Sequence, residues 1–177
     1  MKRIALVLAL AVAALSPALT AQEPESKIIA AVPACPSTVT LDDLIKAIDA
    51  AVSGPANKDR TCFRALFIPE ARLAPLAKTA DGGMAPHLLT VDGWIDAVAK
   101  RGTAVFYERQ VKVKTETYGH LAHLWSTYET RATPEGKAEV RGINSIQAFF
   151  DGKSWKIASI LWQAETPAEP VPEKYLP

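Results

Sequence analysis

The sequence has almost no excess of charge of either sign. Its 20 lysines and arginines are balanced by 19 aspartates and glutamates, which leaves a formal net charge of +1 over 177 residues. Proteins that bind nucleic acid or an anionic membrane through their surface field carry a clear basic excess. We therefore expect no nucleic-acid partner and no membrane-surface binding.

Catalytic and cofactor fingerprints are also missing. There is no nucleophile elbow, no phosphate-binding loop and no dinucleotide fingerprint in the sequence, so we expect no cofactor. His120 and His123 are predicted on opposite faces of the sheet, and His87 lies far away in sequence. The three histidines therefore do not form a metal-ligand set, and we expect no metal site.

Long apolar runs are absent except for one at the start of the chain. Apolar residues 4–15 follow Met1-Lys2-Arg3 and lead to small residues around Ala21. A basic start, a short apolar core and small residues after it are typical of a secretory signal peptide. The run is too short to span a bilayer comfortably. We expect a signal peptide at residues 1–21, with cleavage after Ala18 as the alternative, and a periplasmic or secreted protein that has left the membrane.

Cysteine is scarce, and the chain contains only Cys35 and Cys62. In an exported protein an even number of cysteines indicates a disulfide. This bond would tie the segment before the first helix to the second helix, and it is worth on the order of 3 kcal/mol. Two unpaired buried thiols are the alternative.

Three helices and a short strand are predicted in the first half of the chain. Apolar periodicity and capping signals place the helices at residues 41–52, 59–67 and 91–100. The strand at residues 71–77 contains Pro75, which favours an edge or bulged strand.

The second half is predicted to form four long antiparallel strands within residues 104–165. Tyr118-Gly119, residues 133–136 and Asp151-Gly152 supply the turns between them. The fold class is therefore α+β, with three helices packed on one face of a curled antiparallel sheet. The domain spans residues 38–165, between a polar tether at residues 22–37 and a proline-rich tail at residues 166–177.

Antiparallel pairing predicts which side chains share a face of this sheet. Counting from the turns opposes Arg109 to Tyr128 and Tyr128 to Arg141. The last hairpin then opposes Arg141 to Trp162. An unrecognised β-bulge would transfer all residues on one side of it to the other face. The polar and aromatic row on this face comprises Tyr107, Arg109, Ser126, Tyr128, Arg141, Ser145, Gln147 and Trp162.

The opposite face also carries large apolar side chains, although no further helix is predicted to cover it. A partner subunit is the simplest cover, so we expect a homodimer. A monomer whose tail covers the patch is the alternative. The expected interface residues are Trp125, Ile146, Trp155, Ile157 and Leu161.

The order of elements resembles that of the NTF2-like superfamily, also called SnoaL-like. The Asp151-Gly152-Lys153-Ser154-Trp155 hairpin adds to this likeness. The stretch RGINSIQ at residues 141–147 and the ending EKYLP at residues 173–177 look like a group of exported bacterial members of undefined function. The resemblance implies a cone-shaped sheet with a pocket between sheet and helices, and dimers formed through the convex face.

In the ketosteroid isomerase branch a tryptophan of the last strand lines the pocket, and Trp162 looks like its match. The resemblance therefore places the row of Arg109 and Trp162 in the cone. The general-base position of that branch matches Ala74-Pro75, which has no carboxylate, and its oxyanion-hole acid falls near Ser145 or Gln147. These departures argue against isomerase chemistry.

Three functions remain open at this point. The first is binding of a small, partly apolar and acidic ligand by Arg109 and Arg141, because two guanidinium groups can hold a carboxylate. These arginines have an alternative role, which is pairing with Glu129, Glu165 or the tail. The second function is an isomerase or lyase that uses Glu165 or Tyr107 as its base. The third is a structural or assembly module with a filled cone.

Overall fold

The computed structural model describes residues 34–177. The predicted signal peptide and most of the predicted tether lie outside these residues. Among the residues described, no helix is both long and apolar enough to cross a membrane.

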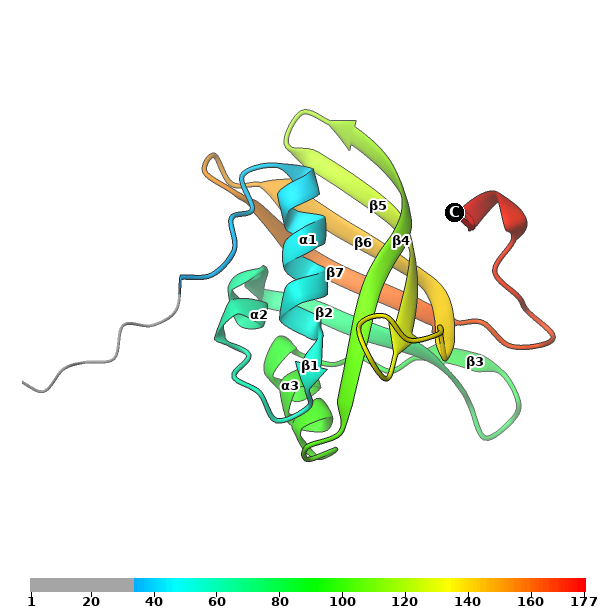
Figure 1. The fold of residues 1–177 in the computed structure, drawn as a ribbon. Coiled ribbons are helices and arrows are strands. Elements are labelled where there is room, and N and C mark those ends of the chain that lie inside the picture. Colours follow the sequence, from blue (N-terminus) through cyan, green and yellow to red (C-terminus); the bar gives the residue numbers. More distant parts are fainter. Residues whose placement is uncertain (1–33) are drawn as a thin grey trace, which may run out of the picture. The chain divides into compact units, whose positions relative to one another are not determined.

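A single sheet carries the fold, with strands in the order β1-β4-β5-β6-β7-β2-β3 (Figure 1). β2 runs parallel to β7, and every other neighbouring pair is antiparallel. The four long strands predicted from the turn signals are all present. The strands are β1 Gly54–Pro55, β2 Phe67–Lys78, β3 Met84–Pro86, β4 Val105–Tyr118, β5 Leu121–Arg131, β6 Val140–Phe150 and β7 Trp155–Ala164.

The helices are α1 Leu41–Val52, α2 Thr61–Ala65 and α3 Val91–Ala99. α1 begins with the expected capping box, in which Thr40 and Asp43 each accept a hydrogen bond from the other's backbone N–H. α2 is shorter than predicted because β2 begins at Phe67, which pairs with Ile157 of β7.

β2 is longer than the predicted strand and does not lie at the edge of the sheet. β3 pairs outside it over the last residues, from Leu76 to Lys78. The bulge that Pro75 suggested is present, but it falls earlier, between Phe67 and Arg72. Pro75 itself pairs with Trp162, and its carbonyl accepts a hydrogen bond from His87 N.

The core lies between α1 and the face of the sheet turned toward it, which we call the inner face. Leu44 and Ile48 of α1 pack there against Leu124, Ile146 and further sheet residues that are almost fully buried. The disulfide between Cys35 and Cys62 is present and fastens the chain before α1 to α2. The helical layer is thus held to the sheet by apolar burial and by one covalent bond.

The opposite face, here the outer face, is partly covered by the chain after β7. This tail, residues 166–177, turns back beside the sheet and ends in the short helix η1 Glu173–Tyr175 (Figure 1). Thr127 Oγ1 donates to the carbonyl of Tyr175 at 2.6 Å, and Trp125 packs against the Tyr175 ring. The tail therefore lies on the face where a partner subunit was expected.

The set of residues expected at a dimer interface does not lie on one face. Ile146 and Ile157 are buried in the inner-face core, and Trp155 packs against that core. Trp125 and Leu161 lie on the outer face, where both pair with Ser145. The expected set is therefore wrong for Ile146, Trp155 and Ile157, because the strand pairing differs from the one counted from the turns.

Candidate functional site

Two β-bulges decide which side chains point into the fold. In β4 the register shifts between Gln110 and Lys112, so Tyr128 opposes Gln110 instead of Arg109. In β7 a second shift lets Trp162 oppose Asn144 instead of Arg141. The pairing of β5 with β6 also differs by one residue from the predicted pairing, and all three hairpin pairings counted for the row are wrong.

The predicted row is consequently divided between the two faces. Ser126, Tyr128 and Trp162 lie on the inner face, with Asn144 between them. The other five members have the opposite parity and do not join this group; they are Tyr107, Arg109, Arg141, Ser145 and Gln147.

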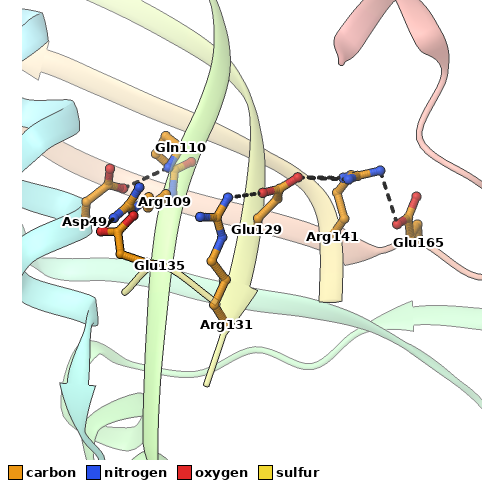
Figure 2. Close-up of polar contacts among 8 residues, drawn as sticks. All are labelled: Asp49, Arg109, Gln110, Glu129, Arg131, Glu135, Arg141 and Glu165. Atoms are coloured by element: carbon orange, nitrogen blue, oxygen red, sulfur yellow. Dashed lines mark hydrogen bonds and ion pairs between the residues drawn. The ribbon is translucent and has the colours of Figure 1, made fainter. Parts of the chain in front are cut away.

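The two arginines of the row are held by carboxylates outside the inner face (Figure 2). Arg141 donates to Glu129 at 2.9 Å, and a second oxygen of Glu129 accepts from Arg131 at 2.6 Å. Arg109 pairs with Glu135 at 3.1 Å. Arg141 therefore has the alternative role expected from the sequence, which is pairing with Glu129, whereas Glu135, the partner of Arg109, was not among the expected partners.

The remaining outer members of the row have separate surroundings. Ser145 Oγ lies 3.1 Å from His123 Nε2 on the neighbouring strand. Gln147 pairs with His123 and Ser159 across the sheet. Tyr107 lies beside the C-terminal half of α1, in a shallow depression that it shares with Arg109.

A cavity of about 390 Å³ lies between the inner face and the helices. Phe63 stacks on Trp94 with ring centroids 4.3 Å apart, and both line this cavity. Exposed residues of the α3–β4 and β5–β6 connections, including Arg101 and Glu139, mark its opening. The other apolar lining residues are Ile48, Val52, Leu73, Val98, Val105, Phe106, Val140, Ile160 and Trp162.

The polar part of the lining comes from three adjacent strands. Glu108 of β4, Tyr128 of β5 and Asn144 of β6 all face the cavity. Gln110 organises this group: its Nε2 donates to Glu108 Oε1 at 3.0 Å, and its Oε1 accepts from Asn144 Nδ2 at 3.2 Å. Ser126 Oγ also donates to Gln110 Oε1.

Burial raises the pKa of Glu108 from its ordinary value of 4.5 to about 7. The hydrogen bond from Gln110 opposes this rise, and the nearby Asp49 carboxylate adds to it. Burial likewise raises the pKa of Asp49 from 3.8 to about 6, although Asp49 accepts a hydrogen bond from Gln110 N at 3.0 Å (Figure 2). Near neutral pH, Glu108 can therefore carry or give up a proton.

Tyr128 lies beside this carboxyl and is almost fully buried. Burial raises the pKa of its phenol, and the charges of Glu108 and Glu165 raise it further, so the group stays protonated at neutral pH. Its ring packs directly over Gly142 on the neighbouring strand, where a side chain would not fit. The cavity therefore contains a neutral phenol next to a carboxyl of shifted pKa.

Glu108, Gln110 and Asn144 were not found from the sequence, because the counted pairing placed Glu108 and Asn144 on the other face. β4 gives no signal of its bulge, because its apolar residues Val105, Tyr107, Val111 and Val113 alternate regularly in the sequence. A usable signal was present in β7, where the apolar residues change parity from Trp155 and Ile157 to Ile160 and Trp162. Such a change within one strand indicates a bulge.

Within residues 34–177, no group of three or more His, Cys, Asp or Glu side chains is placed to hold a metal ion. The acidic residues at the cavity, Glu108 and Glu139, belong to different parts of the lining, one beside Gln110 and the other at the opening. The polar groups present suit hydrogen bonding and proton transfer.

Comparisons with known proteins identify the fold. No protein-family model matches the chain, and no curated protein matches it. A solved structure of the β subunit of a proposed aromatic-ring-hydroxylating dioxygenase from Novosphingobium aromaticivorans is similar, with a TM-score of 0.54 and 14% identity. The match covers 71% of this chain and 87% of that one.

A protein of unknown function with a cystatin-like fold from Nostoc punctiforme matches with a TM-score of 0.50 and 12% identity, over 74% of this chain and 96% of that one. An NTF2-like protein of unknown function from Silicibacter pomeroyi matches with a TM-score of 0.49 and 16% identity, over 71% and 92% of the two chains. The chain has the NTF2-like, cystatin-like fold, which confirms the fold class expected from the sequence.

Proposed function

We propose that this protein binds a small, neutral, partly apolar molecule in the cavity between the helices and the inner face. The observation that carries the proposal is the lining: an apolar cavity of about 390 Å³ with Glu108, Tyr128 and Asn144 gathered on one wall. Ligand sites in proteins are typically apolar pockets of roughly 300 to 1,000 Å³ with a few polar groups that fix orientation.

The charges at the cavity favour a neutral ligand over the acidic one first expected. Arg109 and Arg141, which motivated an acidic ligand, are held by Glu135 and Glu129 away from the cavity. The polar group inside is instead a carboxyl, Glu108, which would repel an anion. A carbonyl or hydroxyl group on the ligand would find donors in Tyr128 and Asn144.

Native mass spectrometry of protein purified from the periplasm tests this proposal. We expect a co-purifying small molecule that is lost when Val98→Phe fills the cavity, because Val98 is buried in its wall. The matched control is Val39→Phe, which adds the same volume at an exposed position outside the cavity lining. Retention of the molecule by the Val98 variant, or loss from both variants, would contradict the proposal.

A second candidate function is acid–base catalysis in the same cavity, and a specific observation favours it. The pKa of Glu108, raised to about 7, suits a group that takes up and releases protons at neutral pH. Glu165 and Tyr107, the bases first considered, do not line this cavity. Glu108 therefore replaces them as the residue on which this candidate depends.

Hydrogen–deuterium exchange at the methyl group of acetophenone in D₂O tests this candidate. The ionised Glu108 would remove a proton from the carbon next to the carbonyl, the carboxyl group would exchange this proton for a deuteron from D₂O, and the deuteron would then be returned to the carbon. We expect exchange to rise with pH through about 7 and to fall roughly 100-fold or more in Glu108→Gln. Glu139→Gln, at the opening, is the control that should retain exchange. Equal rates in the wild type and in Glu108→Gln would exclude Glu108 as the base.

Export and self-association complete the proposal. The basic and apolar start of the chain supports a periplasmic or secreted location, and a disulfide suits an oxidising compartment. A homodimer would use the outer face through Trp125 and Leu161, the members of the expected interface that lie there. Fractionation of cells that produce the full chain, with the processed mass measured, would test the location.

A further inference from the structure

Gln110 forms polar contacts through all parts of its amide group behind the wall of the cavity on the inner face, here called the inner cavity. Its backbone N–H donates to Asp49 Oδ1 of α1 at 3.0 Å (Figure 2). Its side-chain oxygen accepts from Asn144 Nδ2 at 3.2 Å and from Ser126 Oγ. Its side-chain nitrogen donates to Glu108 Oε1 at 3.0 Å. Gln110 of β4 is therefore connected to α1, β5 and β6 at once.

These partners determine which end of the Gln110 amide meets Glu108. An ionised carboxylate can only accept hydrogen bonds, so Glu108 requires the nitrogen end of the amide. The oxygen end then faces Asn144 and Ser126, and both of them have a donor for it. The reverse orientation would place two acceptors, Gln110 Oε1 and the Glu108 carboxylate, against each other. The amide therefore presents a donor to Glu108 whenever this carboxyl is ionised.

The end of α1 holds the backbone of β4 where Glu108 and Gln110 lie. In the part of the chain that the structure describes, β1 pairs with β4 only over residues 105–106, so β4 has no neighbouring strand on this side further along. Ser53 takes the place of such a strand. Its Oγ accepts from the Glu108 N–H at 2.9 Å and donates to the Glu108 carbonyl at 3.1 Å. Together with the Asp49 contact to Gln110, these bonds fix the backbone from which both side chains project.

We propose that Gln110 is the positioning residue of the inner cavity, which fixes the Glu108 carboxyl and the Asn144 amide in the cavity wall without touching the ligand itself. This inference rests on the function proposed for the inner cavity and deepens it. Glu108 and Asn144 line that cavity, whereas Gln110 does not. A donor aimed at a carboxylate stabilises its ionised form. Gln110 therefore also sets the pH at which Glu108 changes its charge.

Other groups near Glu108 act on its pKa as well. Burial raises this pKa, and the Asp49 carboxylate adds to the rise, while the hydrogen bond from Gln110 lowers it and Asn144 lowers it to a smaller extent. The other charged or titratable residues that line a cavity or depression together with Glu108 are Lys46, Arg101, Tyr107, Arg109, Tyr128 and Glu139. All of these groups stay in place when only residue 110 is changed.

The titration of the Glu108 carboxyl, followed by NMR in the ¹³C-labelled full chain without ligand, tests the proposal. The signal is assigned through its loss in Glu108→Gln. We expect Gln110→Met, which keeps the length of the side chain but has no donor, to raise the midpoint from about 7 by about one pH unit, a tenfold change in proton affinity. Gln147→Met, on the outer face, is the matched control and should leave the midpoint unchanged.

A second variant, Gln110→Glu, removes the donor and keeps an acceptor for Asn144 and Ser126. It should raise the Glu108 midpoint at least as far as Gln110→Met does, because two carboxyl groups then face each other. It also serves as the test if Gln110→Met does not fold.

Exchange of acetophenone in D₂O distinguishes positioning from a general loss of structure. Because Gln110 does not touch the ligand, Gln110→Met should lower the maximal exchange rate about tenfold. The acetophenone concentration at half-maximal rate should stay within about twofold of the wild-type value. The pH dependence of exchange should move upward together with the Glu108 midpoint.

The proposal is overturned if the Glu108 midpoint is the same in the Gln110 variants and in the wild type, or if Gln147→Met moves it equally. An exchange rate and pH dependence that do not change in Gln110→Met would also overturn it. If the midpoints move as expected while the wild type shows no exchange, the acid–base candidate fails and the role of Gln110 in holding Glu108 is supported.

Discussion

At the scale of single residues, Gly142 has a role that its sequence context does not reveal. A Cβ built on Gly142 would lie 2.6 Å from Tyr128 Oη and 2.7 Å from Tyr128 Cε1, and it would also meet the carbonyl of Gln163. The Tyr128 ring can approach the strand this closely because residue 142 has no side chain. Gly142 thereby fixes the phenol that faces the inner cavity.

We expect Gly142→Ala to lower the free energy of unfolding by about 2 to 3 kcal/mol, because both the ring and the Gln163 carbonyl must move. Urea unfolding followed by circular dichroism measures this change. Gly83→Ala is the matched control, since the nearest atom there is the end of the Thr79 side chain, at 3.0 Å. Equal destabilisation by the two substitutions would show that the packing of Tyr128 is not the cause.

Glu108 should make the stability of the protein depend on pH. Its pKa is about 7 in the folded protein, against an ordinary value of 4.5, so the folded state binds more protons than the unfolded state between these values. Stability is then fully present below about 4.5 and falls as the pH rises toward 7. Asp49, whose pKa is raised to about 6, contributes in the same direction over a lower range.

Between pH 5 and pH 8 the wild type should lose unfolding free energy as Glu108 ionises. We expect this loss to be smaller in Glu108→Gln, by on the order of 2 kcal/mol. Urea unfolding at these two pH values gives the difference. Glu116→Gln is the control: the ion pair with Lys114 lowers the pKa of Glu116, so this substitution cannot reduce the loss. A pH dependence identical in the wild type and in Glu108→Gln would mean that another group causes it.

At the scale of elements, the sequence predicted which segments are strands and helices but not how β4 and β7 are registered. Turn residues such as Asp151-Gly152 and the cap at Thr40 act locally, so their consequences can be deduced from neighbours in the chain. A bulge at Val111 or Ala158 depends on what packs on both strands and leaves no mark in a turn.

These register shifts made the prediction of the candidate site wrong more than the prediction of the elements, because a shift of one residue moves the side chains of a strand to the opposite face. Tyr128 and Trp162 were correctly predicted to share a face. The predicted pairing of β5 with β6 and that of β6 with β7 each exchange the two faces, so the two errors cancel. Arg141 lies on the strand between these errors and was therefore assigned to the wrong side.

The disulfide belongs to this scale, since it joins the chain before α1 to α2. It closes a loop with a sequence separation of 27 residues. We expect the double substitution Cys35→Ser with Cys62→Ser to cost about 3 to 4 kcal/mol of unfolding free energy. Thermal unfolding with and without dithiothreitol measures the effect. The reductant should destabilise the wild type and leave the double variant unchanged; no response of the wild type would contradict a stabilising bond.

At the scale of the whole molecule, the tail lies on the same outer face that we propose for a second subunit. Residues 166–177 cover part of it through Val171 and Tyr175. Leu161 nevertheless remains 40% exposed. A dimer formed through Trp125 and Leu161 would therefore require the tail to move.

Deletion of residues 166–177 should accordingly raise the dimer fraction of the protein. The deletion exposes Trp125 and the apolar side chains around it, and association is the simplest way to bury them again. Size-exclusion chromatography with light scattering, run over a range of concentrations, measures the mass of both chains. Trp125→Glu in the deleted chain is the control and should restore the monomer, because a charge at the centre of such an interface is costly. A truncated chain with the same mass as the full chain at every concentration would contradict self-association through this face, and a full-chain dimer lost on truncation would assign the contact to the tail itself.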